Sequence, residues 1–525
     1  MLTNQTAARW RGCLALLLAT LLLPSLTAQS GAVPAPARAA APGGISGRVQ
    51  NVVTGQFLNN VRVAVKGTEF VAFTDQAGEY RLPQVPAGPA VIEVYYTGLD
   101  PQEIALTVPS GQTVVRDVDL SSVARYGKDA GSSVVQLDSF IITSSRETDA
   151  EAIATNEQRF ASNIKNVVSA DSFGDIPEGN IGEFMKFLPG VTVDYVQAAV
   201  RTISVRGFAD NMTGVSIDGA QVASSASGSA SRSFELEQVS INNVSRIELT
   251  KVPTPSTPAD SLAGSVNMVS KSAFERSRAQ FRYRGYLSAN HENLSLTRTP
   301  HSFEKYTYKI LPGLDFDYTL PVSKTFGLVI TGLVSNQFNE QHLSHTAFNA
   351  AGTATGASFA RPYFQQHTLQ DGPTTVHRSS ASVKADWKFA PHQVLSVGIQ
   401  GNYFNNYFGT YNWVRNAGTN ANPTVTVANG GVPFSYSDKF TVGATGRGGV
   451  TFGGGFRDKM GATTAGNARY TYDDGNWKVE AGANYSTSRT WYRATDRGHF
   501  AVVNLATVNP VRVSFRDLSP DLPGT

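Results

Sequence analysis

Cysteine is almost absent from this sequence, which has one, Cys13, in 525 residues. Two early arginines, an apolar run over residues 13–23 and the small residues that follow predict a secretory signal peptide over residues 1–28. Its removal would leave a mature chain without cysteine. Such a chain has neither disulfides nor thiolate metal sites.

Charged residues are also scarce, at 16% of the chain, and their signs nearly cancel. Without Arg9 and Arg11, 42 Lys and Arg (44 less two) face 41 Asp and Glu, so the mature net charge is +1. This balance predicts no nucleic-acid partner. Long apolar runs are missing as well, since residues 326–334, the most apolar later run, stop at Ser335. If the chain enters a membrane, it must do so as strands.

What the sequence does contain is glycine, at 48 residues, and aromatic residues, at 10%, which favour a mainly β fold. The length predicts three or four structural units. Residues 29–44 are rich in Pro and Ala and predict a spacer. Short alternating runs over residues 45–121 predict a small antiparallel β-sandwich, in which Asp75 and Gly78 form a tight turn rather than a metal loop.

Two segments of this region, GRVQNVVTGQFLNNVRVAVKGT and TDQAGEYRLPQVPAG, resemble the carboxypeptidase regulatory-like family. The resemblance covers about 75 residues. It implies an immunoglobulin-like β-sandwich.

Residues 122–146 are a polar linker that contains one β-prone island, LDSFIITSSR. A single strand is not stable in water, so this island needs a sheet edge, either in a partner or as a last strand of the sandwich. The island resembles the TonB box of outer-membrane receptors. That resemblance implies that an inner-membrane, TonB-type energy-coupling protein binds the segment by strand addition. The TonB-box residues would be Asp138, Ser139, Phe140, Ile141, Ile142, Thr143 and Ser144.

Residues 147–276 combine helical and strand patterns, with a helix expected around residues 150–162 and another ending at Pro189-Gly190. In the second helix, Ile181, Phe184, Met185 and Leu188 share helical spacing. Five motifs then occur in order: LPGV (188–191), ISVRGF (203–208), IDG (217–219), IELTKVP (247–253) and LAGSVN (262–267). They resemble the plug domain of TonB-dependent receptors. Lys251-Val252-Pro253 and Ala263-Gly264-Ser265 depart from the commonest family pattern, which leaves the subfamily open.

The resemblance implies two sets of functional residues in this plug. Polar contacts would hold the plug in a barrel, and we assign them to Arg206, Glu248 and Lys251. Ligand would touch the plug apices, for which the turn 194–200 and the stretch 222–233 are candidates; each is also compatible with a flexible linker. The candidate ligand residues there are Tyr195, Ser224 and Ser225.

From Gln280 onward the chain alternates with period two. Residues 380–389, 395–403 and 470–485 place apolar side chains on one face and polar ones on the other, as in transmembrane β-barrel strands. Short connections (321–325, 390–393, 474–475) and long ones (336–378, 407–464) also alternate, which predicts periplasmic turns and extracellular loops. Residues 277–525 suffice for about ten to twelve strands, whereas the family resemblance implies a 22-stranded barrel, so we expect an incomplete barrel.

The long loops carry further candidates. Tyr403, Tyr407 and Trp413 suit either ligand stacking or an aromatic girdle at the membrane interface. Residues 446–455 predict a mobile glycine-rich loop. His301 and Glu304 match H-x-x-E, but a catalytic zinc needs a third ligand on a rigid scaffold, so we predict no enzyme, no metal and no cofactor.

The expected fold class is therefore mainly β, with an N-terminal immunoglobulin-like β-sandwich, an α+β plug domain and the N-terminal part of a transmembrane antiparallel β-barrel. The resemblance implies a receptor in outer-membrane lipid, with a periplasmic N-terminal region, that imports a scarce ligand. The ligand stays open between a small molecule, an oligosaccharide and a metal chelate. A receptor that signals or anchors without transport is the alternative.

Overall fold

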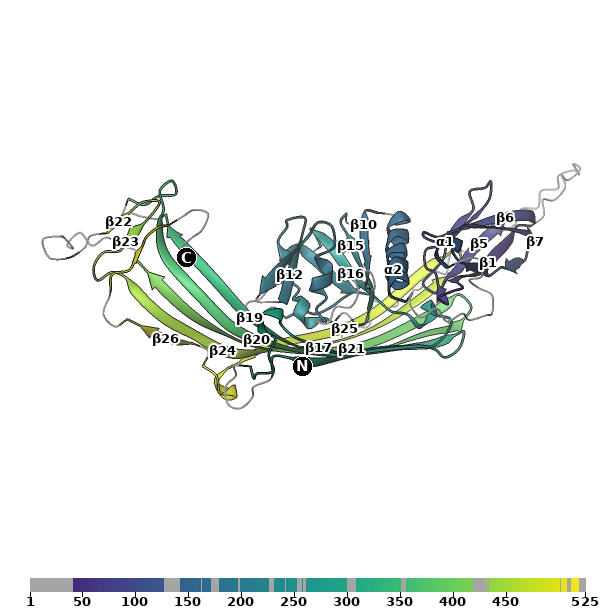
Figure 1. Cartoon of the computed structure of the whole chain (residues 1–525). Helices are drawn as coiled ribbons and strands as arrows, with labels where there is room; N and C mark the ends of the chain where they lie inside the picture. Colours follow the sequence, from purple (N-terminus) through teal and green to yellow (C-terminus); the bar gives the residue numbers. More distant parts are fainter. Residues whose placement is uncertain are drawn as a thin grey trace, which may run out of the picture.

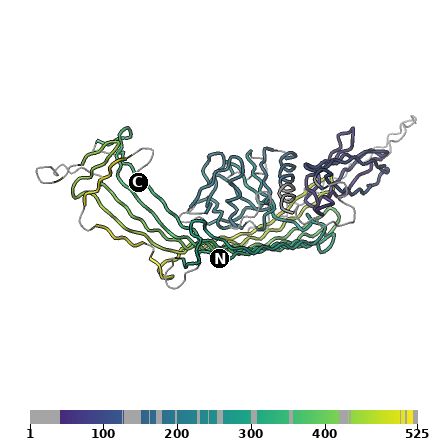
Figure 2. The backbone as a smooth tube through the Cα atoms, viewed as in Figure 1, coloured from purple at the N-terminus to yellow at the C-terminus, as the bar shows by residue number. Residues whose placement is uncertain are grey.

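The computed structural model describes residues 41–126, 142–161, 163–170, 179–196, 199–225, 231–240, 242–252, 257, 261–299, 308–350, 356–418, 431, 434–500, 502–507 and 511–518. The signal peptide, residues 29–40 of the spacer, Asp138–Ile141 and the pair His301 and Glu304 lie outside these ranges. Strands dominate the described chain, as predicted. A compact β domain lies at one end of a long curved sheet, and a second domain lies on its concave face (Figures 1 and 2).

The N-terminal domain, called the sandwich below, consists of two packed sheets. Its strands are β1 (Gly43–Asn51), β2 (Gln56–Phe57), β3 (Arg62–Val65), β4 (Val71–Phe73), β5 (Glu79–Val85), β6 (Gly88–Tyr95), β7 (Gln102–Val108), β8 (Thr113–Val115) and β9 (Val118–Leu120). One sheet has the order β4-β3-β6-β7, and the other has β2-β1-β5. Both β8 and β9 pair with β1 in parallel, so the prediction of a wholly antiparallel sandwich was wrong for these two strands.

The turn between β4 and β5 is the tight turn that the sequence predicted. Asp75 Oδ1 accepts hydrogen bonds from the Ala77 and Glu79 amides at 2.8 and 2.9 Å, and Gly78 has φ +72°. These bonds satisfy the backbone of the turn through its own aspartate. Tyr80, directly after it, is fully buried, and its hydroxyl donates to Arg116 O at 2.7 Å.

Two helices follow the sandwich, α1 (Val123–Tyr126) and α2 (Ile142–Arg159). The helix expected near residues 150–162 therefore begins eight residues earlier, and Ile142, Thr143 and Ser144 are helical instead of extended. A lone strand leaves its backbone groups without partners, whereas a helix satisfies them within the segment.

The plug, residues 147–276, contains a mixed sheet beside a hairpin. Its elements are β10 (Lys165–Ser169), α3 (Gly182–Met185), β11 (Val191–Val196), β12 (Ala199–Val205), η2 (Asp210–Met212), β13 (Thr213–Ile217), β14 (Ala220–Gln221), η3 (Leu236–Gln238), β15 (Val244–Thr250), β16 (Gly264–Ser270) and η4 (Ala273–Glu275). The sheet order is β10-β15-β16-β13-β14, and β11 pairs with β12. Ile181, Phe184, Met185 and Leu188 lie in its core, as their spacing predicted, although α3 is a single turn.

The large sheet, called the wall below, has the order β17-β18-β19-β20-β21-β24-β25 among the described residues, and β26 also pairs with β24. Its strands are β17 (Gln280–Ser288), β18 (Leu311–Pro321), β19 (Phe326–Asn349), β20 (Tyr363–Ala390), β21 (Gln393–Asn416), β24 (Gly449–Asp473), β25 (Lys478–Arg493) and β26 (Val503–Ala506). Smaller elements are η5 (His291–Asn293), β22 (Ser435–Tyr436), β23 (Thr441–Val442), η7 (Thr495–Arg497) and β27 (Ser514–Phe515). All neighbouring wall strands are antiparallel.

The predicted loop lengths of the wall were wrong. The described residues after 277 form eleven strands, of which eight belong to the wall, and β19, β20, β21 and β24 run for 24 to 28 residues each. Much of the predicted loops 336–378 and 407–464 is therefore paired strand, including residues 449–455 of the predicted mobile loop. In the outer halves of β19 and β20, few apolar residues alternate with polar ones, so the strand pattern is weak in the sequence although the backbone pairing continues.

On the wall, apolar side chains are exposed and charged side chains are buried, which is the opposite of a sheet in a soluble protein. Val383 and Ile399 point outward and are 49% and 63% exposed, whereas Lys384 and Asp386 point inward and are 9% and 2% exposed. Apolar side chains outside and buried charges inside are the pattern of a strand between lipid and a filled lumen. No helix within the described ranges is long and apolar enough to cross a membrane.

The sandwich lies at the end of the wall that has the short turns. Glu79 forms an ion pair with Lys388 at the end of β20, and Arg81 donates to Asp473 O at the end of β24. Pro83 lies against Gly475 in the next turn. These contacts place the sandwich and the predicted periplasmic turns on the same side of the wall (Figure 1).

The register of β25 predicts that arginine substitutions at two neighbouring residues, one facing lipid and one facing the plug, have different effects on assembly. Asn484 donates to Gln221 O of the plug, so even-numbered residues face inward, and Tyr485, which is 76% exposed, faces outward. We expect Ala481→Arg to reduce folded protein in outer-membrane fractions, because an arginine at the lipid face costs about 2–4 kcal/mol near the midplane. Gly482→Arg is the control, because residue 482 lies on the inward face of the wall, which already carries the Arg469–Glu480 ion pair at 2.9 Å.

The measurement is the heat-modifiable folded band of each variant on a gel. Equal yields of the two variants, or a lower yield for Gly482→Arg, would show that β25 does not face lipid in this register.

Candidate functional site

The end of α2 joins three parts of the molecule through one carboxylate. Glu157, which is buried, accepts hydrogen bonds from Asn59 and Asn60 of the sandwich, the second at 2.6 Å. It also lies 3.8 Å from the guanidinium of Arg246 in the plug. A displacement of α2 therefore affects both domains.

Arg246 belongs to a buried cluster at the base of the plug. Glu248 lies 2.9 Å from Arg246 Nε and 2.9 Å from Lys165 Nζ. Burial opposes ionisation of Glu248, but the charges of Arg246 and Lys165 outweigh it and hold its pKa below the ordinary value. Glu248 was predicted to contact the barrel. Its partners are in the plug instead, because β15 lies between β10 and β16.

Arg206 and Lys251 also differ from the prediction of plug–barrel contacts. Arg206 has φ +56°, and its guanidinium donates to Ala263 O at 2.8 and 3.0 Å, which ties two plug segments together. The ammonium of Lys251 lies beside Gly190 of the same domain. Among the described contacts, both residues serve the plug itself.

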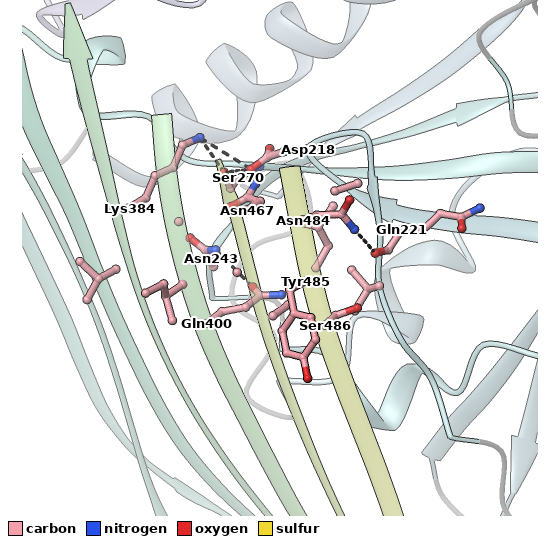
Figure 3. A pocket seen from close by; sticks show the side chains of 18 residues that line it. Asp218, Gln221, Asn243, Ser270, Lys384, Gln400, Asn467, Asn484, Tyr485 and Ser486 are labelled. Carbon is pink, nitrogen blue, oxygen red and sulfur yellow. Dashed lines mark hydrogen bonds and ion pairs between the residues drawn. The ribbon is translucent and has the colours of Figure 1, made fainter. Parts of the chain in front are cut away.

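The contact that ties the plug to β20 is built around Asp218, Ser270 and Lys384. Lys384 Nζ donates to Ser270 Oγ at 2.7 Å and lies 3.8 Å from Asp218 Oδ2, while Asp218 accepts the Ser270 amide at 2.9 Å and its hydroxyl at 2.5 Å. Figure 3 shows the lysine reaching from the wall to these plug residues beside a small cavity. We call these three residues the lower latch.

Burial opposes ionisation of Asp218, but the ammonium of Lys384 and the hydrogen bonds from Ser270 outweigh it and keep its pKa below the ordinary value. One step along β20, Asp386 accepts hydrogen bonds from Ser272 Oγ at 2.8 Å and the Ala273 amide at 3.1 Å. Both wall charges are thus matched by the plug.

A second buried cluster, the upper latch, joins η3 to β24. Lys459 of the wall forms ion pairs with Glu235, at 3.2 Å, and with Glu237, and Arg201 pairs with Glu235 at 2.7 Å. The three residues at the η3–β24 contact are each 5% exposed or less. Two cations therefore balance two carboxylates within the cluster.

The predicted ligand residues of the plug lie in different environments. Ser225 bonds with Gln238 and with Thr490 of β25 at 2.8 Å, so it belongs to the plug–wall interface. Ser224 Oγ accepts the Glu235 amide at 3.0 Å and lines a pocket at the plug apex with Arg232. Tyr195 is exposed on β11, and its hydroxyl lies 3.4 Å from Glu183.

Tyr403, Tyr407 and Trp413 lie on the outward face of β21. Lys459, which points to the plug, pairs with Asn406, so the odd-numbered residues of β21 face away from the plug. This orientation contradicts a role in stacking on a ligand above the plug. An aromatic girdle at the membrane interface stays a prediction for the three rings, and Tyr407 is buried against Phe456 and His499.

The sequence analysis did not predict that the residues of the two latches form contacts between the plug and the wall. Asp218 was noted only as part of a motif, and Lys384 and Asp386 only as the polar face of a strand. A usable signal existed, because a charged residue on the inward face of a barrel strand needs a partner on whatever fills the lumen. Within the described ranges there is no group of three or more His, Cys, Asp or Glu that could hold a metal ion.

The comparisons with known proteins address the plug directly. A family model described as the TonB-dependent Receptor Plug Domain matches residues 157–266. The chain contains the plug domain of TonB-dependent receptors. A second model, the Carboxypeptidase regulatory-like domain, matches residues 44–121, so the resemblances of the N-terminal sandwich and of the plug motifs are confirmed.

Solved structures similar to the chain include one receptor and two transporters. The siderophore receptor PirA from Acinetobacter baumannii is 10% identical over 65% of this chain and 59% of its own, with a TM-score of 0.27. The unliganded ferric citrate transporter FecA (12%, 67% and 60%, TM-score 0.29) and the copper transporter OprC (9%, 67% and 62%, TM-score 0.28) are similar to the same extent. The chain spans about 60% of the length of these proteins. No curated protein matches it.

The lower latch generates a stability prediction. Asp218→Asn leaves the Lys384 ammonium buried without a counter-charge, which costs about 3–5 kcal/mol. We expect the plug transition to move to lower temperature in calorimetry of the purified protein. Adding Lys384→Gln should recover part of the loss, and Asp194→Asn, on an exposed strand position, should have no effect.

The same pair predicts a pH dependence. Because the pKa of Asp218 is depressed, its stabilising effect is complete above the ordinary aspartate value of about 4 and is lost as pH falls through the depressed pKa. If Asp218→Asn lowered the plug transition temperature equally with and without Lys384→Gln, the ion pair would not stabilise the plug. A loss of plug stability on raising the pH from 4 to 7 would also contradict the lower latch.

Proposed function

We propose that this protein is a TonB-dependent outer-membrane receptor that binds a ligand at the cell surface and imports it into the periplasm by energy-coupled displacement of its plug. The observation that carries the proposal is the plug domain packed on the charged inner face of a wall whose outer face is apolar and exposed. A domain that fills a membrane pore must move before anything passes.

The position of the sandwich supports the orientation. It contacts the short turns of the wall through Glu79 and Arg81, and short turns are periplasmic in outer-membrane barrels. The segment 138–144 follows the sandwich in the chain, so it would be presented to the periplasm. There the periplasmic domain of a TonB-type protein would add it as a strand to its own sheet.

The contacts of α2 suggest how force would reach the plug. A pull on residues 138–144 would first unwind Ile142–Ser144, which are helical here, and then act on Glu157. Glu157 is bonded to Asn60 and lies against Arg246, so the pull would separate α2 from the sandwich and load the base of the plug.

The latches suit this mechanism because they are polar. When Lys384 and Asp218, or Lys459 and its two glutamates, are pulled apart, water can solvate both charges, and hydration offsets much of the lost attraction. The apolar core of the plug has no such compensation. We therefore expect the plug to leave the wall before it loses its own fold.

The coupling segment gives the test of this function. Ile141→Pro should abolish energy-dependent uptake while surface level and ligand binding stay unchanged, because proline lacks the amide that an added strand donates. Ser133→Pro, in the polar linker before the segment, is the matched control and should transport normally.

Uptake is measured with the labelled compound that the purified receptor binds, in cells with and without the inner-membrane motor. Normal uptake by Ile141→Pro would place the coupling segment elsewhere. Binding at the surface without any motor-dependent uptake in the unmodified protein would overturn import and favour a signalling or anchoring receptor.

A further inference from the structure

The inner face of the wall continues beyond the plug and changes its chemistry there. The strands β19, β20, β21 and β24 run past the plug toward β22 and β23 (Figure 1). The inward residues of this extension follow from the register, because Lys384, Gln400 and Lys459 all contact the plug. Even-numbered residues of β20 and β21 and odd-numbered residues of β19 and β24 therefore face inward.

Amides and hydroxyls gather on this inward extension. We call the following half-buried residues the amide face: Gln341, Gln366, Thr368, Gln370, Thr410, Asn412 and Asn416. The register places them as cross-strand neighbours, for example Gln370 opposite Asn412 and Gln366 opposite Asn416. The outward residues next to them on β21, Tyr411 and Trp413, are aromatic, so the amides belong to one face only.

Hydrogen bonds among these side chains hold them in place without using all of their capacity. Asn416 donates to Gln366 at 3.0 Å, Gln366 donates to Thr368 at 3.2 Å, and Gln370 donates to Gln341 at 3.4 Å. The Oδ1 atom of Asn412 is buried, so it does not face a ligand. Each primary amide carries two donor hydrogens and one acceptor, and the bonds above use one donor of each donating amide, so donors remain on these half-buried side chains for a ligand.

Charged residues border this surface but are not part of it. The amide face itself has no charged residue. Toward the plug, Lys459 is matched by Glu235 and Glu237, Arg378 is buried, and the exposed Arg457 holds its guanidinium 5.0 Å from the ring of Phe408 and 4.9 Å from that of Tyr492. Phe408, half-buried, adds an aromatic surface beside Thr410.

We infer that the amide face binds an uncharged, hydroxyl-rich ligand, namely a neutral oligosaccharide. Vicinal hydroxyls each donate and accept, which matches rows of amides, and Phe408 offers an apolar surface to a sugar ring. An anionic metal chelate needs cations in direct contact with it, and the residues of the amide face include none. The inference rests on the proposed function, because it places the amide face in the ligand path outside the plug.

The first experiment compares ligand classes. The purified full chain in detergent is applied to an array of neutral and acidic oligosaccharides, and its binding of ferric citrate and of a ferric catecholate is measured by titration. We expect retention on neutral oligosaccharides and no binding of either chelate. Retention of no neutral oligosaccharide, or tighter binding of a chelate, overturns the inference.

The second experiment locates the site with adjacent residues on opposite faces. Gln370→Ala with Asn412→Ala removes two inward amides and should weaken binding of the retained oligosaccharide about tenfold or more. Leu369→Ala with Trp413→Ala changes the neighbouring outward residues and should alter affinity less than about twofold. Both proteins are checked for the same heat-modifiable folded band, so a folding defect is seen separately.

Wild-type affinity in the folded inward variant would overturn the site, whatever its ligand. The inference and the proposed function fail separately. Motor-dependent uptake of a metal chelate that Ile141→Pro blocks would leave import intact and remove the oligosaccharide. Oligosaccharide binding at the amide face without motor-dependent uptake would support the oligosaccharide site and overturn import.

Discussion

Buried charges on the inner face of the wall are the constraint on which the rest of the structure depends. Lys384, Asp386 and Lys459 are each at least nine-tenths buried, and a charge in such a place needs a partner. The plug provides partners for all three, through Asp218, Ser272 and the pair Glu235 and Glu237, and Ser396 of β21 adds a hydrogen bond to Asp386 at 2.6 Å. Wall and plug therefore specify each other. The outer face, which needs no such partner, is free to be apolar.

This arrangement separates two kinds of cohesion in one molecule. The plug is held together by an apolar core that includes Leu236, Ile247 and Val266, whereas its attachment to the wall is by ion pairs and hydrogen bonds. The two respond differently to solvent, because water stabilises separated charges but not separated apolar groups. An interface of this type opens without unfolding the domain behind it.

Much of the fold could be predicted from the sequence, and the limits are instructive. Period two assigned the faces of residues 380–389 and 470–485, and ordered motifs located β12, β13, β15 and β16. Periodicity states which face a residue occupies but not which distant residue meets it. Glu248 was thus assigned to the barrel when its partners are Arg246 and Lys165, and the pairing of Asp218 with Lys384 was invisible.

Other errors had a local cause. The outer halves of β19 and β20 have few apolar residues in alternation with polar ones, so their pairing left little trace in the sequence, and Ile142–Ser144 have strand propensity but are helical here. The wrong assignment of Trp413 to a ligand-facing position could have been avoided. Tyr403 had already been assigned to the apolar face, and continuing the same alternation for ten residues would have placed Trp413 on that face as well.

Glu157 has a consequence for how such receptors diversify. Its carboxylate is shared between Asn59 and Asn60 of the sandwich and Arg246 of the plug. A recombination that brought in a new sandwich without these asparagines would leave a buried carboxylate short of donors, and a foreign plug without the arginine would leave it short of a counter-charge. The two domains can therefore be exchanged between genes as a unit, together with α2, more readily than either can be exchanged alone.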